Sequence, residues 1–213
     1  MKVFLVAPIL DDNPATEITI EWAVHLEELL CDLGDENMIV VPFLGKEAVR
    51  VKVEAALKKD KNNKGIFVFI DHGENDKLFG SDDQTLLDTE NIHLLKNKFI
   101  YAVACKSAST LGHKALKNNV AGYIGFTDRF HIMPTAKNTY GHCFLSGIKD
   151  IILQKASVLE AMERVKNEIN RVIHKLKTHK KIHPITRNAV ITSLMHNLNC
   201  MVCLGDTDWR IRS

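Results

Sequence analysis

The chain has 213 residues, of which 46% are hydrophobic and 25% are charged. Its 28 basic and 26 acidic side chains leave a formal net charge of only +2, which argues against nucleic acid or an anionic membrane surface as the main partner. The length fits one domain, residues 1–213, that is large enough to bury a core without disulfides or metals.

The opening segment, "MKVFLVAPIL", is a short apolar run broken by a proline, and it lacks the small-residue cleavage site of a secretory signal. No other segment reaches the ~20 apolar residues of a membrane-spanning helix. The five cysteines are an odd number scattered along the chain, which suits a reducing compartment. We therefore expect a cytoplasmic protein that makes no membrane contact.

Short runs rich in Val, Ile and Phe recur along the first part of the chain. Their nearly continuous apolar character is typical of strands that are buried on both faces of a parallel sheet. A more polar run near the end resembles a last strand. The predicted strands are 2–10, 38–45, 65–71, 98–105, 120–126 and 199–211.

Helical patterns separate these runs. Asn13 and Pro14 form a good cap and first turn for the first helix. The basic segment 175–183 fits a solvated helix end better than an anion-binding site. This alternation predicts a three-layer α/β/α sandwich with a mostly parallel central sheet of about six strands. The predicted helices are 15–34, 46–59, 135–153, 155–176 and 186–197, with a further helix opening behind Cys105.

Two chemically distinctive residues follow consecutive predicted strands, His72 after 65–71 and Cys105 at the end of 98–105. Ligands of open α/β sheets bind at the carboxyl ends of the strands, and consecutive strands are usually neighbours. Neighbouring strands lie ~4.8 Å apart, so side chains that leave their ends can reach one substrate bond. The sequence therefore predicts a catalytic dyad of His72 and Cys105.

The residue types suit nucleophilic catalysis. A thiolate attacks carbonyl carbon well, and both a nearby imidazole and a helix N-terminus favour the thiolate form. Gly73 lacks a Cβ, so its backbone N–H can approach a developing oxyanion closely. The N–H of Cys105 is the second expected donor of this oxyanion hole.

The segments that hold these residues, "FVFIDHGE" and "FIYAVACKSA", resemble the His-Gly and Cys motifs of caspase-like (clan CD) cysteine peptidases. Two later segments extend the resemblance: "VAGYIGFTDRF" is similar to a strand and loop of separases and CHAT domains, and "MVCLGDTDWRI" to a final strand of CHAT and gingipain-type domains. The resemblance covers most of the chain and is nearest to CHAT, separase and gingipain-type domains.

This resemblance implies a cysteine endopeptidase that cleaves peptide bonds through a thioester acyl-enzyme. Cys105 is the implied nucleophile, His72 handles the protons, and neither a third catalytic residue, a cofactor nor a metal is required. The implied substrate is a protein or peptide. Because a free-standing peptidase needs restraint, we also expect activation by a regulatory protein partner, by a cut, or by loop ordering.

The resemblance to separases places an acid at Asp128, where it would bind a basic P1 side chain by charge-assisted hydrogen bonds. The equally weighted alternative is that Asp128 pairs with Arg129 or caps a turn. Arg129 also keeps an acidic P1 open. Asp71 and Glu74 flank the base and could tune it, but acids at a strand end facing solvent are the favoured interpretation.

The other metal and cysteine candidates fit structural roles. Cys200 and Cys203 have C-x-x-C spacing, but no second pair completes four zinc ligands, so core packing is favoured. Cys31 and Cys143 lie in helical patterns and are expected in the core. Segment 81–91 is acidic without the ligand spacing of a calcium loop, and we expect a solvated loop along the cleft.

Two rival functions remain. The first is a non-catalytic, caspase-like protein-interaction module, and the second, more distant one is a nucleotide or small-ligand binder. The strand ends carry no G-x-G-x-x-G phosphate loop, which argues against the second. Both dyad members are intact, which favours the enzyme over the first.

Overall fold

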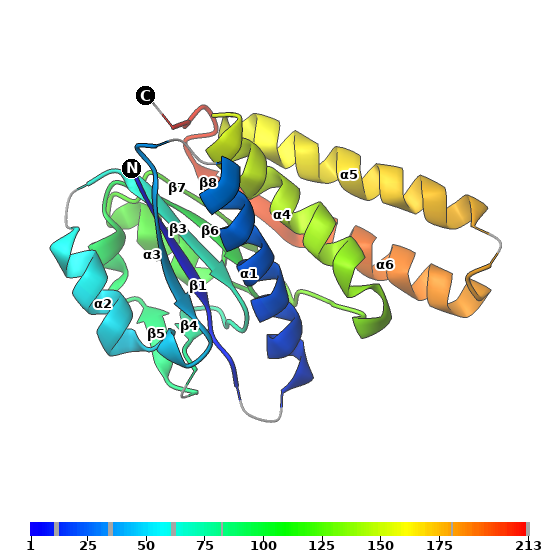
Figure 1. The fold of residues 1–213 in the computed structure, drawn as a ribbon, viewed down its shortest axis with the longest axis horizontal. Coiled ribbons are helices and arrows are strands. Elements are labelled where there is room, and N and C mark those ends of the chain that lie inside the picture. The colour runs from blue at the N-terminus through cyan, green and yellow to red at the C-terminus, as the bar shows by residue number, and fades with distance from the viewer. Residues whose placement is uncertain (11–12, 34–35, 61–62, 82, 180, 212–213) are drawn as a thin grey trace.

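The computed structural model describes residues 1–10, 13–33, 36–60, 63–81, 83–179 and 181–211. A mostly parallel six-stranded sheet lies between two helical layers (Figure 1), which confirms the predicted α/β sandwich. The strands of this sheet are β1 (Lys2–Ala7), β2 (Ile39–Leu44), β3 (Gly65–Ile70), β6 (Lys98–Val103), β7 (Gly122–Phe126) and β8 (Met201–Gly205).

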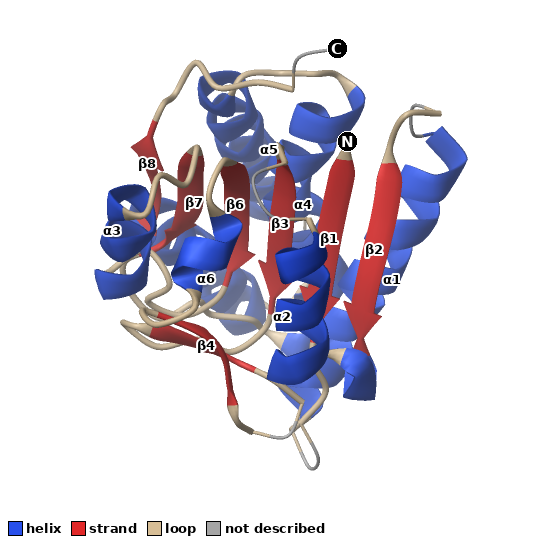
Figure 2. Cartoon of the chain, turned by 90° about the vertical axis from the view of Figure 1, so that its left-hand side faces the viewer, coloured by secondary structure: helices blue, strands red, loops and turns tan. Residues whose placement is uncertain are grey.

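The sheet has the strand order β2-β1-β3-β6-β7-β8 (Figure 2). All neighbours run parallel except the last pair, in which β8 is antiparallel to β7. The carboxyl ends of the five parallel strands therefore meet at one edge. Strands β3 and β6 are direct neighbours, with Ile70 opposite Val103 at that edge.

Alternate residues of the strands pack into two hydrophobic cores, one on each face of the sheet. In β1, Val3 and Leu5 pack with one set of helices, whereas Phe4 and Val6 pack with the other. The four-helix face consists of α1 (Pro14–Leu33), α4 (Lys137–Leu153), α5 (Val158–Thr178) and α6 (Pro184–Cys200). The two-helix face consists of α2 (Arg50–Lys59) and α3 (Thr110–Lys117).

The helix ends follow the local sequence signals. Asn13 Oδ1 accepts a hydrogen bond from Ala15 N–H at the start of α1, as the cap prediction requires. Ser157 and Glu160 form a capping box at the start of α5, which satisfies two backbone donors. Short 3-10 helices are η1 (Gly45–Glu47), η2 (Ile92–Leu95) and η3 (Pro134–Ala136).

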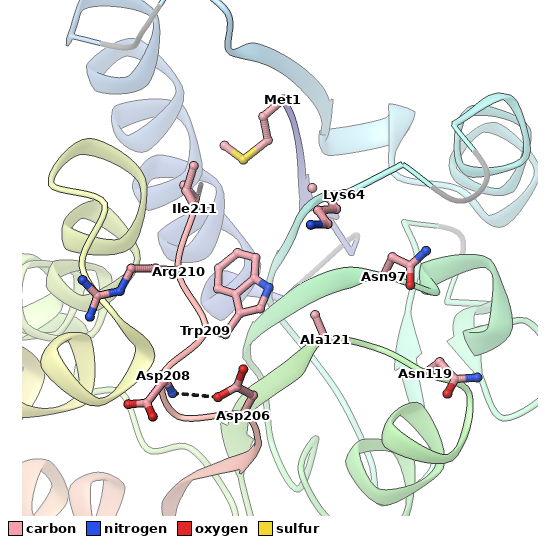
Figure 3. A pocket seen from close by; sticks show the side chains of 11 residues that line it. Met1, Lys64, Asn97, Asn119, Ala121, Asp206, Asp208, Trp209, Arg210 and Ile211 are labelled. Atoms are coloured by element: carbon pink, nitrogen blue, oxygen red, sulfur yellow. Dashed lines mark hydrogen bonds between the residues drawn. The ribbon is translucent and has the colours of Figure 1, made fainter. Parts of the chain in front are cut away.

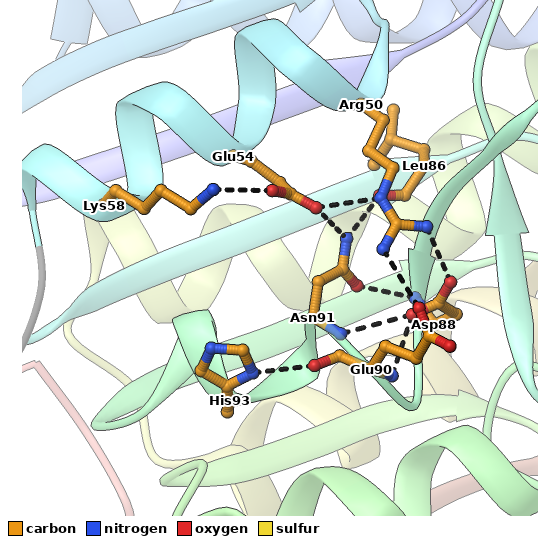
Figure 4. A network of polar contacts seen from close by, with 8 residues as sticks. All are labelled: Arg50, Glu54, Lys58, Leu86, Asp88, Glu90, Asn91 and His93. Atoms are coloured by element: carbon orange, nitrogen blue, oxygen red, sulfur yellow. Dashed lines mark hydrogen bonds and ion pairs between the residues drawn. The ribbon is translucent and has the colours of Figure 1, made fainter.

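The acidic segment 81–91 is not the solvated loop that we expected. It contains β5 (Thr85–Asp88), which pairs antiparallel with β4 (Lys77–Phe79), and its Leu86 and Leu87 are buried. Arg50 of α2 donates to Asp88 and Glu54, and Asn91 also donates to Glu54 (Figure 4). The acids of this segment therefore serve in part to anchor the hairpin to α2.

Candidate active site

Strand β3 delivers His72 to the carboxyl edge of the sheet. The strand ends at Ile70, and the next residue still bonds across the strand boundary, from Asp71 N–H to Val103 O at 3.1 Å. His72 follows in a half-buried position, with 37% of its side chain exposed. The apolar run thus ends where the imidazole can reach both the protein interior and the surface.

Strand β6 delivers Cys105 to the same edge, two residues beyond its last residue, Val103. The His72 and Cys105 side chains line one pocket of about 350 Å³, as expected from adjacent parallel strands. A second pocket of about 350 Å³ also contains Cys105 in its wall, together with Gly73. The structure therefore places the predicted pair in the wall of one pocket, and Cys105 also lines a second.

The first of these pockets, here called the His72 pocket, has a largely apolar wall. Its lining residues come from α1, from the ends of β3 and β6, and from the loop after β7. They are Ala15, Thr19, Asp71, His72, Val103, Cys105, Phe130, His131 and Ile132. The second, here called the Gly73 pocket, has charged walls made of Glu74, Asp76, Lys106 and Arg129, together with Gly73, Asn75 and Cys105.

Asn13 holds the imidazole of His72 through a contact that the sequence analysis missed. Its Nδ2 lies 2.9 Å from His72 Nε2, while its Oδ1 caps α1. No hydrogen bond occupies His72 Nδ1 among the described residues, so this nitrogen is available to a substrate. Burial lowers the pKa of His72, and the charge of Asp83 partly opposes this shift.

Asp71 does not face solvent, which corrects the favoured interpretation of this acid. Its side chain is 1% exposed; Oδ1 accepts from His72 N–H and lies 3.5 Å from His72 Nε2, while Oδ2 contacts the Thr19 hydroxyl. Burial raises the pKa of Asp71 to about 7, against the opposing effect of these hydrogen bonds. Glu74, in contrast, is exposed and pairs with Lys77.

The sulfur of Cys105 has one backbone donor close by. Phe130 N–H, in the loop after β7, donates to Cys105 Sγ at 3.3 Å. Helix α3 begins at Thr110, after a turn that separates it from Cys105. The N-terminus of α3 is therefore less close to the sulfur than the sequence suggested, whereas the loop after β7 is in contact with it.

Two backbone N–H groups at the site are available for an oxyanion. Among the described residues, neither Gly73 N–H nor Cys105 N–H has a hydrogen-bond partner. Gly73 packs so closely that a Cβ would lie 3.0 Å from Cys105 O and 3.1 Å from Ala104 Cβ. A larger residue would push this segment away from Cys105, so the glycine is needed for the close approach.

Asp128 lies in the same loop as Phe130 but in the wall of neither site pocket. Its carboxylate is exposed and accepts a hydrogen bond from Arg129 N–H at 2.8 Å, which lowers the pKa of Asp128. Its backbone O accepts from Lys106 N–H, next to the candidate nucleophile. Arg129, not Asp128, lines the Gly73 pocket.

The remaining cysteines divide between core and surface. Cys143 and Cys200 are buried and Cys203 packs against the core, as predicted, but Cys31 is exposed on α1, contrary to expectation. All five thiols are unpaired. Within the described part of the chain, no group of three or more His, Cys, Asp or Glu side chains could hold a metal ion.

Two further observations concern regions outside this site. A pocket of about 550 Å³ lies at the opposite, amino-terminal edge of the sheet, where Trp209 of the final segment lies toward Lys64 and the Arg210 side chain points away from it (Figure 3). None of the predicted site residues lines it. Among the described helices, none has the length and apolar character needed to cross a bilayer.

No protein-family model and no curated protein sequence matches the chain. Among solved structures, the chain is similar to the crystal structure of the Arg-specific cysteine proteinase gingipain R, with a TM-score of 0.58 and 14% sequence identity. The match covers 99% of this chain and 47% of that one, so the chain spans about half the length of gingipain R. This likeness shows the caspase-like fold. The nearer relation to CHAT and separase domains stays a prediction.

Proposed function

We propose that the chain is a cysteine endopeptidase in which Cys105 is the nucleophile and His72 the acid and base. The observation that carries the proposal is that both residues line one pocket, at the ends of adjacent parallel strands. The likeness of the fold to a cysteine proteinase adds support. The substrate is a peptide bond in a protein or peptide.

In the proposed reaction, the thiol proton of Cys105 passes to His72 and the sulfur attacks the scissile carbonyl carbon. The resulting oxyanion accepts hydrogen bonds from Gly73 N–H and Cys105 N–H. His72 then protonates the leaving amine as the C–N bond breaks, which leaves a thioester on Cys105. Water, deprotonated by the neutral imidazole, hydrolyses the thioester and restores the thiol.

The surroundings of His72 suit this role. Asn13 Nδ2–H donates to Nε2, so the neutral resting ring carries its proton on Nδ1. Nδ1–H is therefore the group that protonates the leaving amine, and the ring takes up the thiol proton at Nε2 once the Asn13 contact is released. Burial lowers the pKa of His72, which keeps the ring neutral and basic at pH 7. Activity should therefore persist below the pH at which an ordinary histidine becomes protonated.

Labelling with peptide acyloxymethyl ketones tests the proposal. Probes with Arg, Asp or Leu at P1 should modify Cys105, as located by peptide mass spectrometry, and His72→Ala should abolish the modification. Exposed Cys31 is the internal control, because its labelling should be slow and independent of His72. Folded protein that leaves Cys105 unmodified by every probe, and cleaves no peptide, would favour the interaction module instead.

The same probes test P1 specificity. We propose a basic P1 preference through Asp128, which belongs to the loop beside the thiol. Asp128→Asn should then reduce labelling by the Arg probe and leave labelling by the Leu probe unchanged. A preference for the Asp probe that Arg129→Ala removes would assign the selectivity to Arg129 in the Gly73 pocket.

We further propose that a protein partner, a cut or loop ordering activates the peptidase. The isolated, uncut chain should hydrolyse unfolded substrates slowly, and its activity should rise on addition of the activator. High constitutive activity of the purified chain towards an unfolded protein would argue against this restraint.

A further inference from the structure

The loop 127–133 leads from β7 to η3 and forms part of the wall around Cys105. It supplies Phe130 N–H to Cys105 Sγ at 3.3 Å, and its Asp128 O accepts from Lys106 N–H at 2.9 Å. A donor aimed at sulfur stabilises negative charge there, because hydrogen bonds to charged groups are stronger than those between neutral groups. The position of this loop therefore bears directly on the reactivity of the thiol.

Helix α6 holds this loop at three alternate residues. Thr127 N–H donates to Cys200 O at 2.8 Å, and His196 Nε2 lies 2.9 Å from Arg129 O. The third contact is double: Asn197 Oδ1 accepts from His131 N–H and Asn197 Nδ2 donates to His131 O, both at 2.8 Å. The Asn197 amide thus pairs with the loop as a neighbouring strand would.

Asn197 is well placed to act as a rigid support. It is 0% exposed, and its amide has both a donor and an acceptor role filled by the same loop residue. Phe130 is also fixed through its ring, which packs edge-on against Phe126 and Phe144 with centroids 4.8 and 4.9 Å away. The amide of Phe130 is consequently held between an aromatic cluster and the end of α6.

We propose that Asn197 is a positioning residue that sets the reactivity of Cys105 by holding loop 127–133, with Phe130 N–H directed at the sulfur. The proposal deepens the proposed peptidase function, because it assigns control of the nucleophile to a helix near the end of the chain. If Asn197 were only a structural support, its loss would lower stability without changing how a folded molecule reacts.

The test measures alkylation of Cys105 by iodoacetamide in the full chain, which needs no peptidase activity. Asn197→Ala removes both contacts to His131, whereas Asn197→Asp keeps the acceptor and loses the donor. Val190→Ala is the matched control, since Val190 is a core residue of the same helix, 4% exposed, on the four-helix face. Conditions are chosen under which circular dichroism shows each variant to be folded.

We expect Asn197→Ala to slow alkylation of Cys105 at pH 7 about tenfold, in line with partial loss of a hydrogen bond to a charged group, and to move the pH profile of the reaction to higher pH. Asn197→Asp should lie between it and the unaltered chain. Val190→Ala should leave both rate and profile unchanged, and exposed Cys31 should react equally in all variants.

Unchanged or faster alkylation of Cys105 in folded Asn197→Ala would overturn the proposal, as would an equal slowing in Val190→Ala. The outcome is separable from that of the proposed function. If alkylation responds as expected but no peptide is cleaved and no ketone probe reacts, the peptidase assignment fails while the positioning role of Asn197 stands.

Discussion

Asn13 combines two roles, helix capping and contact with the candidate base. One side of its amide caps α1 through Ala15 N–H, and the other contacts His72 Nε2. The imidazole is thereby tied to the start of a helix on the four-helix face. The ring is thus oriented by an uncharged amide. The adjacent carboxyl of Asp71 is not fully ionised at neutral pH, because its pKa is raised to about 7.

If this orientation matters, Asn13→Ala should lower kcat/KM roughly 10- to 100-fold, because a loosened base is misplaced for proton transfer. Asn13→Asp keeps a capping oxygen and places a negative charge near Nε2, which raises the pKa of His72 and moves the acid limb of the pH profile to higher pH. Steady-state kinetics measures kcat/KM and its pH profile, on a peptide with the sequence of the ketone probe that labels Cys105 best. An unaltered kcat/KM in Asn13→Ala would exclude the orienting role.

The buried carboxyl of Asp71 makes a prediction about stability. Its pKa rises from 3.8 to about 7, so between these values the folded chain holds a proton that the unfolded chain has released. Stability from this group is therefore lost as pH rises through that window. Asp71→Asn should increase the free energy of unfolding, relative to the unaltered chain, by little at pH 4 and by roughly 3 kcal/mol at pH 8.

Urea unfolding across pH 4–8 measures this difference. Asn is a fair replacement, because its oxygen can accept from His72 N–H while its amide contacts the Thr19 hydroxyl. Asp76→Asn in the exposed part of the same loop is the control and should show no such trend. A constant difference between Asp71→Asn and the unaltered chain at all pH values would contradict the burial argument.

At the scale of elements, a polar network joins the β4–β5 hairpin to α2 (Figure 4). Arg50 joins Glu54 to Asp88, and Asn91 bridges Glu54 and Leu86 O. Hydrogen bonds from Lys58, then Asn91, lower the pKa of Glu54 to about 2. Because Gly73 bridges to Leu78 of β4, this anchoring also supports the oxyanion segment.

Glu54→Gln should therefore lower the free energy of unfolding by about 2 kcal/mol at pH 7, and the loss should shrink as pH falls from about 4.5 towards 2. The sign follows from the lowered pKa: the carboxylate stabilises the fold above its unfolded pKa and ceases to do so once it is protonated. Glu47→Gln, which breaks an exposed pair with Lys52, is the comparison and should cost much less. Equal losses in the two variants would argue against the network.

The sequence predicted these elements unevenly, for physical reasons. Strands β1, β3 and β6 were predictable because both of their faces are buried, which leaves continuous apolar runs. The hairpin was missed because β4 and β5 are only three and four residues long and carry charged ends. Their attachment to α2 involves Arg50, which no local pattern connects to Asp88.

The site divides in the same way. His72, Gly73 and Cys105 could be found because each follows a recognisable strand at a sheet edge. The contact of Asn13 with His72 was missed and the burial of Asp71 was misjudged, because both depend on contacts distant in sequence, the second with Thr19. One signal was available for Asn13: it follows the first strand and so reaches the same edge.

At the scale of the whole molecule, the site draws on both ends of the chain, from Asn13 to Asn197. The final segment also returns to the sheet, where Trp209 stacks on Phe99 with centroids 4.7 Å apart and its O accepts from Val158 N–H. Both ends of the chain are thus in contact with its middle. We therefore predict that residues 1–213 unfold as one cooperative domain.

Two tryptophans in separate elements, which pack on the same core, allow this prediction to be tested. Trp22 of α1 is 5% exposed and packs against Gly141 of α4, whereas Trp209 lies over β6 at the amino-terminal edge. During urea unfolding, the fluorescence of the Trp209→Phe variant comes from Trp22, and the fluorescence of the Trp22→Phe variant comes from Trp209. Because the two variants can differ in stability, circular dichroism is recorded on the same sample and serves as the reference for each variant.

For one domain, the midpoints from fluorescence and from circular dichroism should coincide within each variant, and buried Cys143 should become open to alkylation at that same midpoint. A Trp209 transition that precedes loss of helix, with Cys143 still protected, would mean that the final segment unfolds separately and that 1–213 is not a single cooperative unit.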